Sequence, residues 1–167
     1  MFAENKGYRL NWFQCFGFGT YRIYACRAVR KDGTFYGYMT KTKFTNGQTG
    51  VLFLGRENLN KTIEWDVRFA ISNKRKRIKA WIEEREDLDD TTGTCGLEGL
   101  IWAKNGILEF EKFIKEYYLK RDKCKKHRIT ISWTDNKRKK VYTRYLKRYG
   151  YELKIHYGAE FLVKDVF

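Results

Sequence analysis

The sequence predicts an α+β fold, with a mixed, mostly antiparallel sheet flanked by helices. Three observations predict it: aromatic and β-branched segments in the first 72 residues, a long amphipathic pattern near the middle, and alternating strand and helix patterns after it. The chain has 167 residues and is 43% hydrophobic, which fits one domain with a sizeable core. We therefore expect residues 1–167 to form a single domain.

The first part of the chain has the pattern of strands joined by tight turns. Segments 21–29 and 34–44 are rich in aromatic and β-branched residues, and Lys31-Asp32-Gly33 between them is a hairpin signal. Asn46-Gly47 marks a turn before a short apolar strand at 51–54.

Two further segments show alternation. Apolar and charged residues alternate over 62–72, which predicts a half-buried antiparallel strand. Ile78, Ala80 and Ile82 also alternate, so we expect another strand over 78–87.

The second half of the chain predicts helices between strands. Apolar residues recur every three or four positions over 97–120, which indicates a long amphipathic helix. A short strand is expected at 127–133 and a basic helix at 136–149, capped at its C-terminal end by Gly150. The chain then closes with a hairpin around Gly158-Ala159.

The protein is strongly basic. It has 35 Lys and Arg against 20 Asp and Glu, a net charge of +15, of which +9 falls on residues 121–167. A field of this sign attracts polyanions: nucleic acid, an acidic protein surface or a phosphate-bearing cofactor. The alternative is that the charges are solvated and serve solubility. The candidate contacts are two tetrads: Lys74, Arg75, Lys76, Arg77, Lys137, Arg138, Lys139 and Lys140.

Cysteine content and hydropathy bear on the setting of the protein. Four Cys residues are too few for a disulfide scaffold, and no apolar run approaches the roughly 18 residues of a membrane span. The first residues lack the pattern of a signal peptide. We therefore expect a cytoplasmic, reducing setting and no membrane partner.

A small loop at 91–96 precedes the long helix. A Gly-containing turn that opens a helix presents backbone N–H groups to a phosphate or pyrophosphate, although an ordinary helix entry has the same composition. The dinucleotide fingerprint and the P-loop pattern are both absent.

The second half resembles the GNAT superfamily of acyl-coenzyme A-dependent N-acyltransferases. The resemblance covers about residues 78–160 and rests on the loop TTGTCG with its following helix, on Asn136 near a helix start, on Tyr142 and Tyr145, and on the Gly150-Tyr151 pair. It implies a GNAT-like three-layer domain, with antiparallel strands over 1–77 and an acyl-coenzyme A-binding half over 78–167.

The resemblance also implies an activity. Acetyl-coenzyme A, or a related acyl-coenzyme A, would donate its acyl group to an amine, and the edge of strand 78–87 would pair with the pantetheine arm. Tyr145 is the first candidate to protonate the leaving thiolate and Tyr142 the second, although packing on an amphipathic helix explains either one. The implied coenzyme contacts are Thr92, Gly93, Thr94, Cys95, Gly96, Leu97 and Asn136.

An acidic run at 83–90 stands out in this basic protein. It holds six carboxylates, and Glu84 and Glu86 are candidates for the base that takes the proton of the amine. A solvated strand end is the alternative. His127 and His156 are far apart and the Cys residues are unclustered, so we expect no metal site.

Two other classes of function remain open. One is a non-enzymatic protein that binds nucleic acid or another partner through the basic tetrads. The other is a Mg²⁺-dependent phosphoryl-transfer enzyme built on the carboxylates of 83–90.

Overall fold

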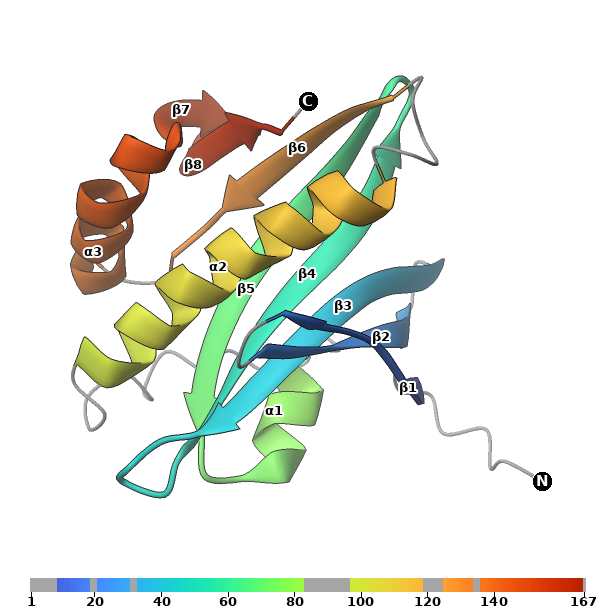
Figure 1. Cartoon of the computed structure of the whole chain (residues 1–167), viewed down its shortest axis with the longest axis vertical. Helices are drawn as coiled ribbons and strands as arrows, with labels where there is room; N and C mark the ends of the chain where they lie inside the picture. Colours follow the sequence, from blue (N-terminus) through green and yellow to red (C-terminus); the bar gives the residue numbers. More distant parts are fainter. Residues whose placement is uncertain are drawn as a thin grey trace.

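The computed structural model describes residues 9–18, 21–30, 33–82, 97–118, 125–133 and 136–166. The chain folds into an eight-stranded mixed sheet in the order β1-β2-β3-β4-β5-β6-β8-β7, with helices packed on it (Figure 1). This confirms the predicted α+β class.

The first five strands form an antiparallel meander. They confirm the strands predicted at 21–29, 34–44 and 62–72, while the strand predicted at 51–54 is longer at both ends. The strands are β1 (Arg9–Phe18), β2 (Tyr21–Arg30), β3 (Gly33–Lys43), β4 (Thr49–Leu59) and β5 (Thr62–Ser72).

The last three strands complete the sheet in a different order. β6 (Lys126–Ile131) pairs with β5 in parallel. β8 (Ala159–Asp165) lies antiparallel between β6 and β7 (Glu152–His156), so the final hairpin inserts its second strand next to β6. Tyr157 and Gly158 form the hairpin turn with positive φ angles of 51° and 77°, as the Gly158-Ala159 signal predicted.

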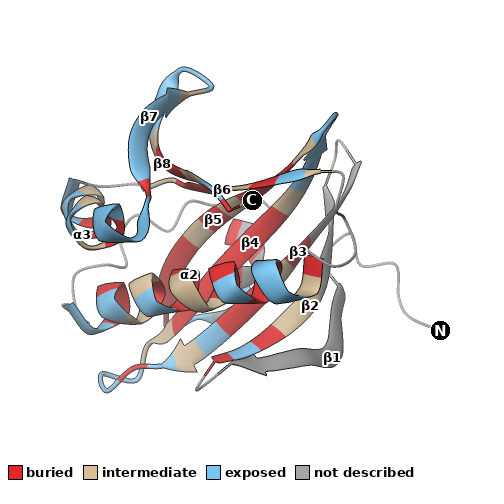
Figure 2. Cartoon of the chain, turned by 45° about the horizontal axis from the view of Figure 1, so that its top comes forward, coloured by how far each residue is buried: buried red, intermediate tan, exposed pale blue. Residues whose placement is uncertain are grey.

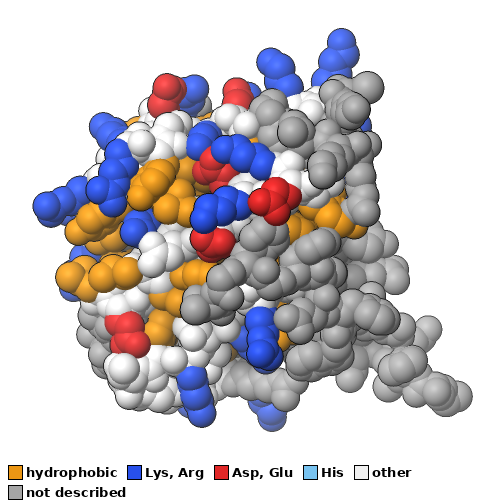
Figure 3. Space-filling model, viewed as in Figure 1, with side chains coloured by type: hydrophobic (Ala, Val, Ile, Leu, Met, Phe, Trp, Pro, Cys, Tyr) orange, Lys and Arg blue, Asp and Glu red, His pale blue; other side chains and the backbone are white. Residues whose placement is uncertain are grey.

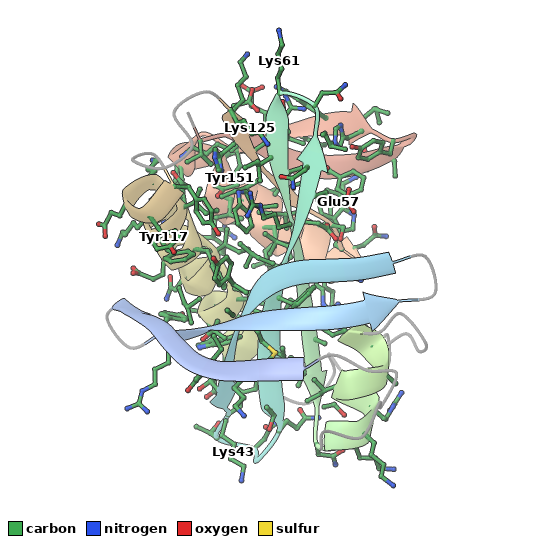
Figure 4. The ribbon with its side chains drawn as sticks, turned by 90° about the vertical axis from the view of Figure 1, so that its right-hand side faces the viewer. Lys43, Glu57, Lys61, Tyr117, Lys125 and Tyr151 are labelled. Carbon is green, nitrogen blue, oxygen red and sulfur yellow. The ribbon has the colours of Figure 1, made fainter. Side chains whose placement is uncertain are left out.

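The helices lie on both faces of the sheet. α1 (Arg75–Ile82) and α2 (Leu97–Tyr118) cover opposite faces, as Figure 4 shows. α3 (Asn136–Leu146) continues into a 3-10 turn (Lys147–Tyr149), and Gly150 ends it with a φ of 88°, as expected for a glycine cap.

The main core lies between α2 and the sheet, where Figure 2 shows the buried residues concentrated. α2 presents Ala103, Ile107, Phe110 and Ile114, which pack with the alternate apolar residues of β5. The alternation over 62–72 therefore places one side of β5 under α2, as a pleated strand requires. The β5 members of this core are Ile63, Trp65, Val67, Phe69 and Ile71.

The strand predicted over 78–87 is wrong in its first part, because residues 75–82 form α1. Ile78 and Trp81 are three residues apart and both buried, a helical spacing that the alternation of Ile78 and Ala80 concealed. α1 covers the second face of β5, where the Arg68 guanidinium carbon lies 5.5 Å from the Phe53 ring centroid and 5.8 Å from that of Trp81. Residues 83–87 lie outside the described part.

Gly106 allows α2 to lie close to the sheet. A Cβ atom added there would be 2.7 Å from Cδ2 of Leu52 and 3.1 Å from Cε1 of Tyr21. Leu52 is fully buried, so its methyl group has no open space to enter.

We expect Gly106→Ala to give little or none of the roughly 1 kcal/mol that Ala gains over Gly at an open helical site. Gly106→Val should destabilise the protein by about 1–3 kcal/mol, because it overpacks the core. Asn105→Ala, at the exposed neighbouring position, is the control and should stabilise by up to ~0.7 kcal/mol. Urea unfolding measures all three, and a full gain for Gly106→Ala would show that the helix is not closely packed there.

A buried carboxylate ties α2 to the C-terminal strands. Glu111 accepts hydrogen bonds from Lys115 Nζ at 2.8 Å, from Lys164 Nζ, and from the hydroxyl of Tyr151 at 3.1 Å (Tyr151 is labelled in Figure 4). Burial alone would raise the pKa of Glu111, but the hydrogen bonds and charges of Lys115 and Lys164 outweigh it and lower that pKa below 4.5. Lys164 also donates to the backbone oxygen of Tyr149, which extends the link to the end of the 3-10 turn.

Because folding lowers the pKa of Glu111, its contribution to stability should be present above about pH 4.5 and lost as the pH falls further. Glu111→Gln should therefore cost about 1.5–3 kcal/mol near neutral pH and progressively less toward pH 3. Glu116→Gln, an exposed carboxylate on the same helix, should change stability by less than about 0.5 kcal/mol. A Glu111→Gln penalty that is constant between pH 7 and pH 3 would contradict this.

Candidate functional site

The candidate site lies at the carboxyl ends of the parallel strands. The pairing of β5 with β6 ends at Val67 and Ile131, but β5 continues through residues 68–72. Figure 1 shows the chain leaving β6 toward α3 while β5 continues toward α1. Over 68–72, β5 pairs with β4 on one side, and no strand of the described part pairs with its other edge. Backbone N–H and C=O groups that no strand pairs can bind an extended ligand. Here Phe69, Ala70, Ile71 and Ser72 are only 1–7% exposed, so such a ligand would have to displace what covers them.

Two cations flank this open length of β5 on opposite faces. The guanidinium carbon of Arg138, at the beginning of α3, lies 5.5 Å from the ring centroid of Phe69, and the side chain is only 3% exposed. On the other face, Arg68 lies between aromatic rings and forms an ion pair with Asp66 at 3.3 Å. In open α/β sheets, ligands bind beyond the carboxyl ends of parallel strands, and cations there suit an anionic ligand.

The structure describes little of the predicted coenzyme loop. Glu84, Glu86, Thr92, Gly93, Thr94, Cys95 and Gly96 lie outside the described residues. Leu97 is the first residue of α2 and Asn136 the first of α3, and both are exposed. The start of α3 follows β6 in the chain, as predicted, but α2 follows α1 and not the strand predicted over 78–87.

The two candidate tyrosines of α3 have different surroundings. Tyr142 is 1% exposed and belongs to the main core, together with Leu146. Tyr145 is half-buried, and cations from both α2 and α3 surround its ring: Lys104 at 5.8 Å, Arg144 at 5.6 Å and Arg148 at 5.9 Å from the centroid. Of the two, Tyr145 is therefore the one that solvent and a ligand can reach.

The basic tetrad at 137–140 is not one continuous patch. Lys137 and Lys140 are exposed, Arg138 is buried beside Phe69, and Lys139 Nζ donates to the Glu160 carboxylate of β8. In the tetrad at 74–77, Lys74 and Lys76 are exposed and Arg77 is half-buried.

The sequence did not reveal a second feature, the pairing of Glu64 with His156. Nε2 of His156 lies 2.9 and 3.2 Å from the two carboxylate oxygens of Glu64, although the residues are 92 positions apart. Glu64 is on the charged side of β5, where alternation predicts exposure, yet it is only 4% exposed. The β7–β8 hairpin brings His156 to it, and no local signal in the sequence shows this contact.

The surroundings of this pair concentrate negative charge. Burial raises the pKa of Tyr157, and the nearby charges of Glu64 and Glu57 raise it further, while Arg128 acts in the opposite direction. Nε of Arg128 donates to Asp165 at 2.7 Å, and this hydrogen bond is the main reason that the pKa of Asp165 is lowered. Arg128 is thus paired with the Asp165 carboxylate, and the Glu64 carboxylate is hydrogen-bonded to His156.

The pairing has a chemical consequence. When Nε2–H of His156 donates to Glu64, Nδ1 becomes the basic nitrogen of the ring. A carboxylate that orients an imidazole and stabilises its charged form is the usual arrangement of a general base. Glu64 lies three residues before Val67, so the pair is about 10 Å along β5 from the point where the two strands separate.

The other histidine is part of the core. His127 is fully buried, and its Nδ1 accepts a hydrogen bond from Nε1 of Trp65 at 3.1 Å. Among the described residues, no group of three or more His, Cys, Asp or Glu side chains is arranged to hold a metal ion. The described helices include none that is long and apolar enough to cross a membrane.

Comparisons of the chain with protein-family models, curated proteins and solved structures give no match. The function is therefore argued from the geometry of the open β5 edge and the Glu64–His156 pair.

Proposed function

We propose that the protein transfers an acyl group from an acyl-coenzyme A to an amine. The observation that carries this proposal is the edge of β5 over residues 68–72, beyond the last pair with β6, which no strand of the described part of the chain pairs. The pantetheine arm of coenzyme A is extended and carries amide groups, so it can pair with such an edge as an added strand would. Its pyrophosphate would then lie toward the loop at 83–96 and the beginning of α2.

The order of elements supports the same proposal. The strand β5, the short helix α1, the long helix α2 and the parallel strand β6 are followed by a Tyr-bearing helix and a closing hairpin. This is the order on which the resemblance to the N-acyltransferase superfamily was based, with one change. The strand that would pair with the pantetheine arm is β5 rather than 78–87, because α1 occupies the first part of that segment.

The proposed reaction needs a base and an acid. The amine nitrogen attacks the thioester carbonyl, a C–N bond forms, the C–S bond breaks and coenzyme A leaves as its thiolate. We assign the amine proton to His156, oriented by Glu64, either directly or through one water. Tyr145 is the proposed source of the proton for the thiolate, since Tyr142 is enclosed in the core. It would act through water, because it lies beside α2 whereas Glu64 faces the other side of β5. The carboxylates of Glu57 and Glu64 would attract a cationic amine.

Acetyl-coenzyme A should raise the melting temperature of the protein. A concentration of 100 times the dissociation constant adds about 2.7 kcal/mol, which corresponds to roughly 5–10 °C for a chain of this size. Gly93→Val and Gly96→Val should remove the shift, because a side chain there would obstruct the pyrophosphate. Their circular dichroism spectra without ligand should match that of the wild type. No shift with millimolar acetyl-coenzyme A, and no heat in calorimetry, would contradict the proposal.

Glu64→Gln and His156→Gln should each lower the rate of acetyl transfer by about 10²–10⁴-fold, the usual contribution of a general base. The assay follows thiol release from acetyl-coenzyme A with a panel of amines that includes peptidyl lysine and polyamines. Both variants should keep the thermal shift with acetyl-coenzyme A. Glu160→Gln, an exposed carboxylate on the same hairpin, should be fully active. Full activity of both Glu64→Gln and His156→Gln would assign the base to another group.

A further inference from the structure

The outer surface of α3 carries cations without neighbouring carboxylates. Residues 136–149 contain seven Lys and Arg and no Asp or Glu. Lys139 pairs with Glu160, but no carboxylate in the described part of the chain forms an ion pair with Lys137, Lys140, Arg144 or Arg148. Their positive charge is therefore directed to solvent.

The helical period arranges these cations in a row. Arg138, Tyr142 and Leu146 face inward and are buried, so the opposite side of the helix faces solvent. Successive cations of the row are three or four residues apart, which places neighbouring Cβ atoms about 5–6 Å apart. The row consists of Lys137, Lys140, Arg144 and Arg148, all exposed.

Aromatic and aliphatic side chains lie next to this row. The ring of Tyr145 has three cations within 5.9 Å of its centroid, and the Tyr149 ring, 39% exposed, has Arg148 at 5.2 Å. Ile101 of α2 is 49% exposed. In Figure 3, hydrophobic side chains and Lys and Arg side chains occur together at the left, where Figure 1 places α3 and the beginning of α2.

We propose that this α3 surface, formed by Lys137, Lys140, Arg144, Tyr145, Arg148 and Tyr149, binds single-stranded nucleic acid. The cations contact phosphates, and the rings of the half-buried Tyr145 and the exposed Tyr149 stack on bases, which is the combination that single strands require. A duplex keeps its base faces covered and would leave the tyrosines unused. A purely acidic protein surface would need the cations alone, and the cations that surround Tyr145 hinder deep insertion into lipid.

This surface does not depend on acyl transfer, and one residue separates the two proposals. Tyr145→Phe keeps the ring for stacking but removes the hydroxyl that would protonate the thiolate. It should therefore lose acyl transfer and keep nucleic-acid binding. Tyr145→Ala should lose both, and the coenzyme-induced thermal shift of either variant reports separately on coenzyme binding.

The test is fluorescence anisotropy with a fluorescein-labelled 20-nucleotide oligo-dT, titrated with the full chain at several salt concentrations. Four or five phosphate contacts predict that log affinity falls with log salt with a slope of about −2.8 to −3.5, at roughly 0.7 per contact. Tyr145→Ala should weaken binding about 5- to 100-fold, and Tyr145→Phe should bind like the wild type.

A matched pair of double variants separates the α3 surface from net charge. Arg144→Gln with Arg148→Gln should weaken binding roughly tenfold or more and reduce the slope by about 1.4. Lys61→Gln with Lys154→Gln removes the same charge from exposed positions in the β4–β5 turn (Lys61 is labelled in Figure 4) and on β7, and should leave the slope unchanged. Melting temperatures confirm that each variant is folded.

Four outcomes would overturn the proposal. The first is no binding to the oligonucleotide at 20 mM salt. The second is an equal loss in the two double variants, which would mean that net charge alone attracts the strand. The third is equal affinity for a 20-base-pair duplex with no effect of Tyr145→Ala, which would mean phosphate contact without stacking. The fourth is binding only to an acidic peptide or to anionic vesicles, which would assign the surface to that partner.

Discussion

The parallel pairing of β5 with β6 is the constraint on which the rest of the structure depends. A parallel neighbour cannot be reached through a tight turn, so the chain must cross a face of the sheet between the two strands. α2 lies on this crossover, and its apolar side buries the alternate residues of β5. The same pairing places the carboxyl ends of both strands together, where β5 extends beyond β6 and no described strand pairs with its edge. The core and the candidate site therefore have the same origin.

The position of β8 determines what surrounds that site. Because β8 lies between β6 and β7, the last hairpin extends the sheet beyond β6, with β7 as its edge strand. It brings His156 to Glu64 and Lys164 to Glu111. One contact serves the proposed chemistry and the other holds α2 against the C-terminal strands. The position of the β7–β8 hairpin thus contributes to the stability of the fold and also orients the general base that we propose.

Much of the fold was predictable where one hydrophobic period continued over many residues and no second period fitted the same segment. The alternation over 62–72 predicted both ends of β5, and the period over 97–120 predicted α2 to within two residues. The error at 78–87 came from a short segment in which Ile78 and Ala80 fit an alternation while Ile78 and Trp81 fit a helix. Only the packing of α1 on the second face of β5 decides between them.

The site was less predictable, because its residues are brought together by the order of the strands and not by spacing along the chain. Glu64 has the local pattern of an exposed residue, and the hairpin that covers it lies about ninety residues away. The tetrad at 137–140 looked uniform, but the helical period turns Arg138 inward and pairs Lys139 with β8. Arg144 and Arg148, outside any run of charges, complete the outward row. Period and topology, rather than composition, decide which charges reach a partner.

The distribution of charge bears on how the two proposals fit together. A net charge of +15 repels a free cationic amine, so an acceptor needs a local attraction that opposes the overall field. Glu57 of β4 and Glu64 of β5 supply that attraction on the face of the sheet turned away from α2, whereas α3 and the turn after it carry an exposed row of four cations. A nucleic acid held on α3 would neutralise part of the positive field, which extends only about one Debye length, 8–10 Å, in salt. An amine already associated with nucleic acid would approach with the positive field instead of against it, and would be the acceptor best suited to this protein.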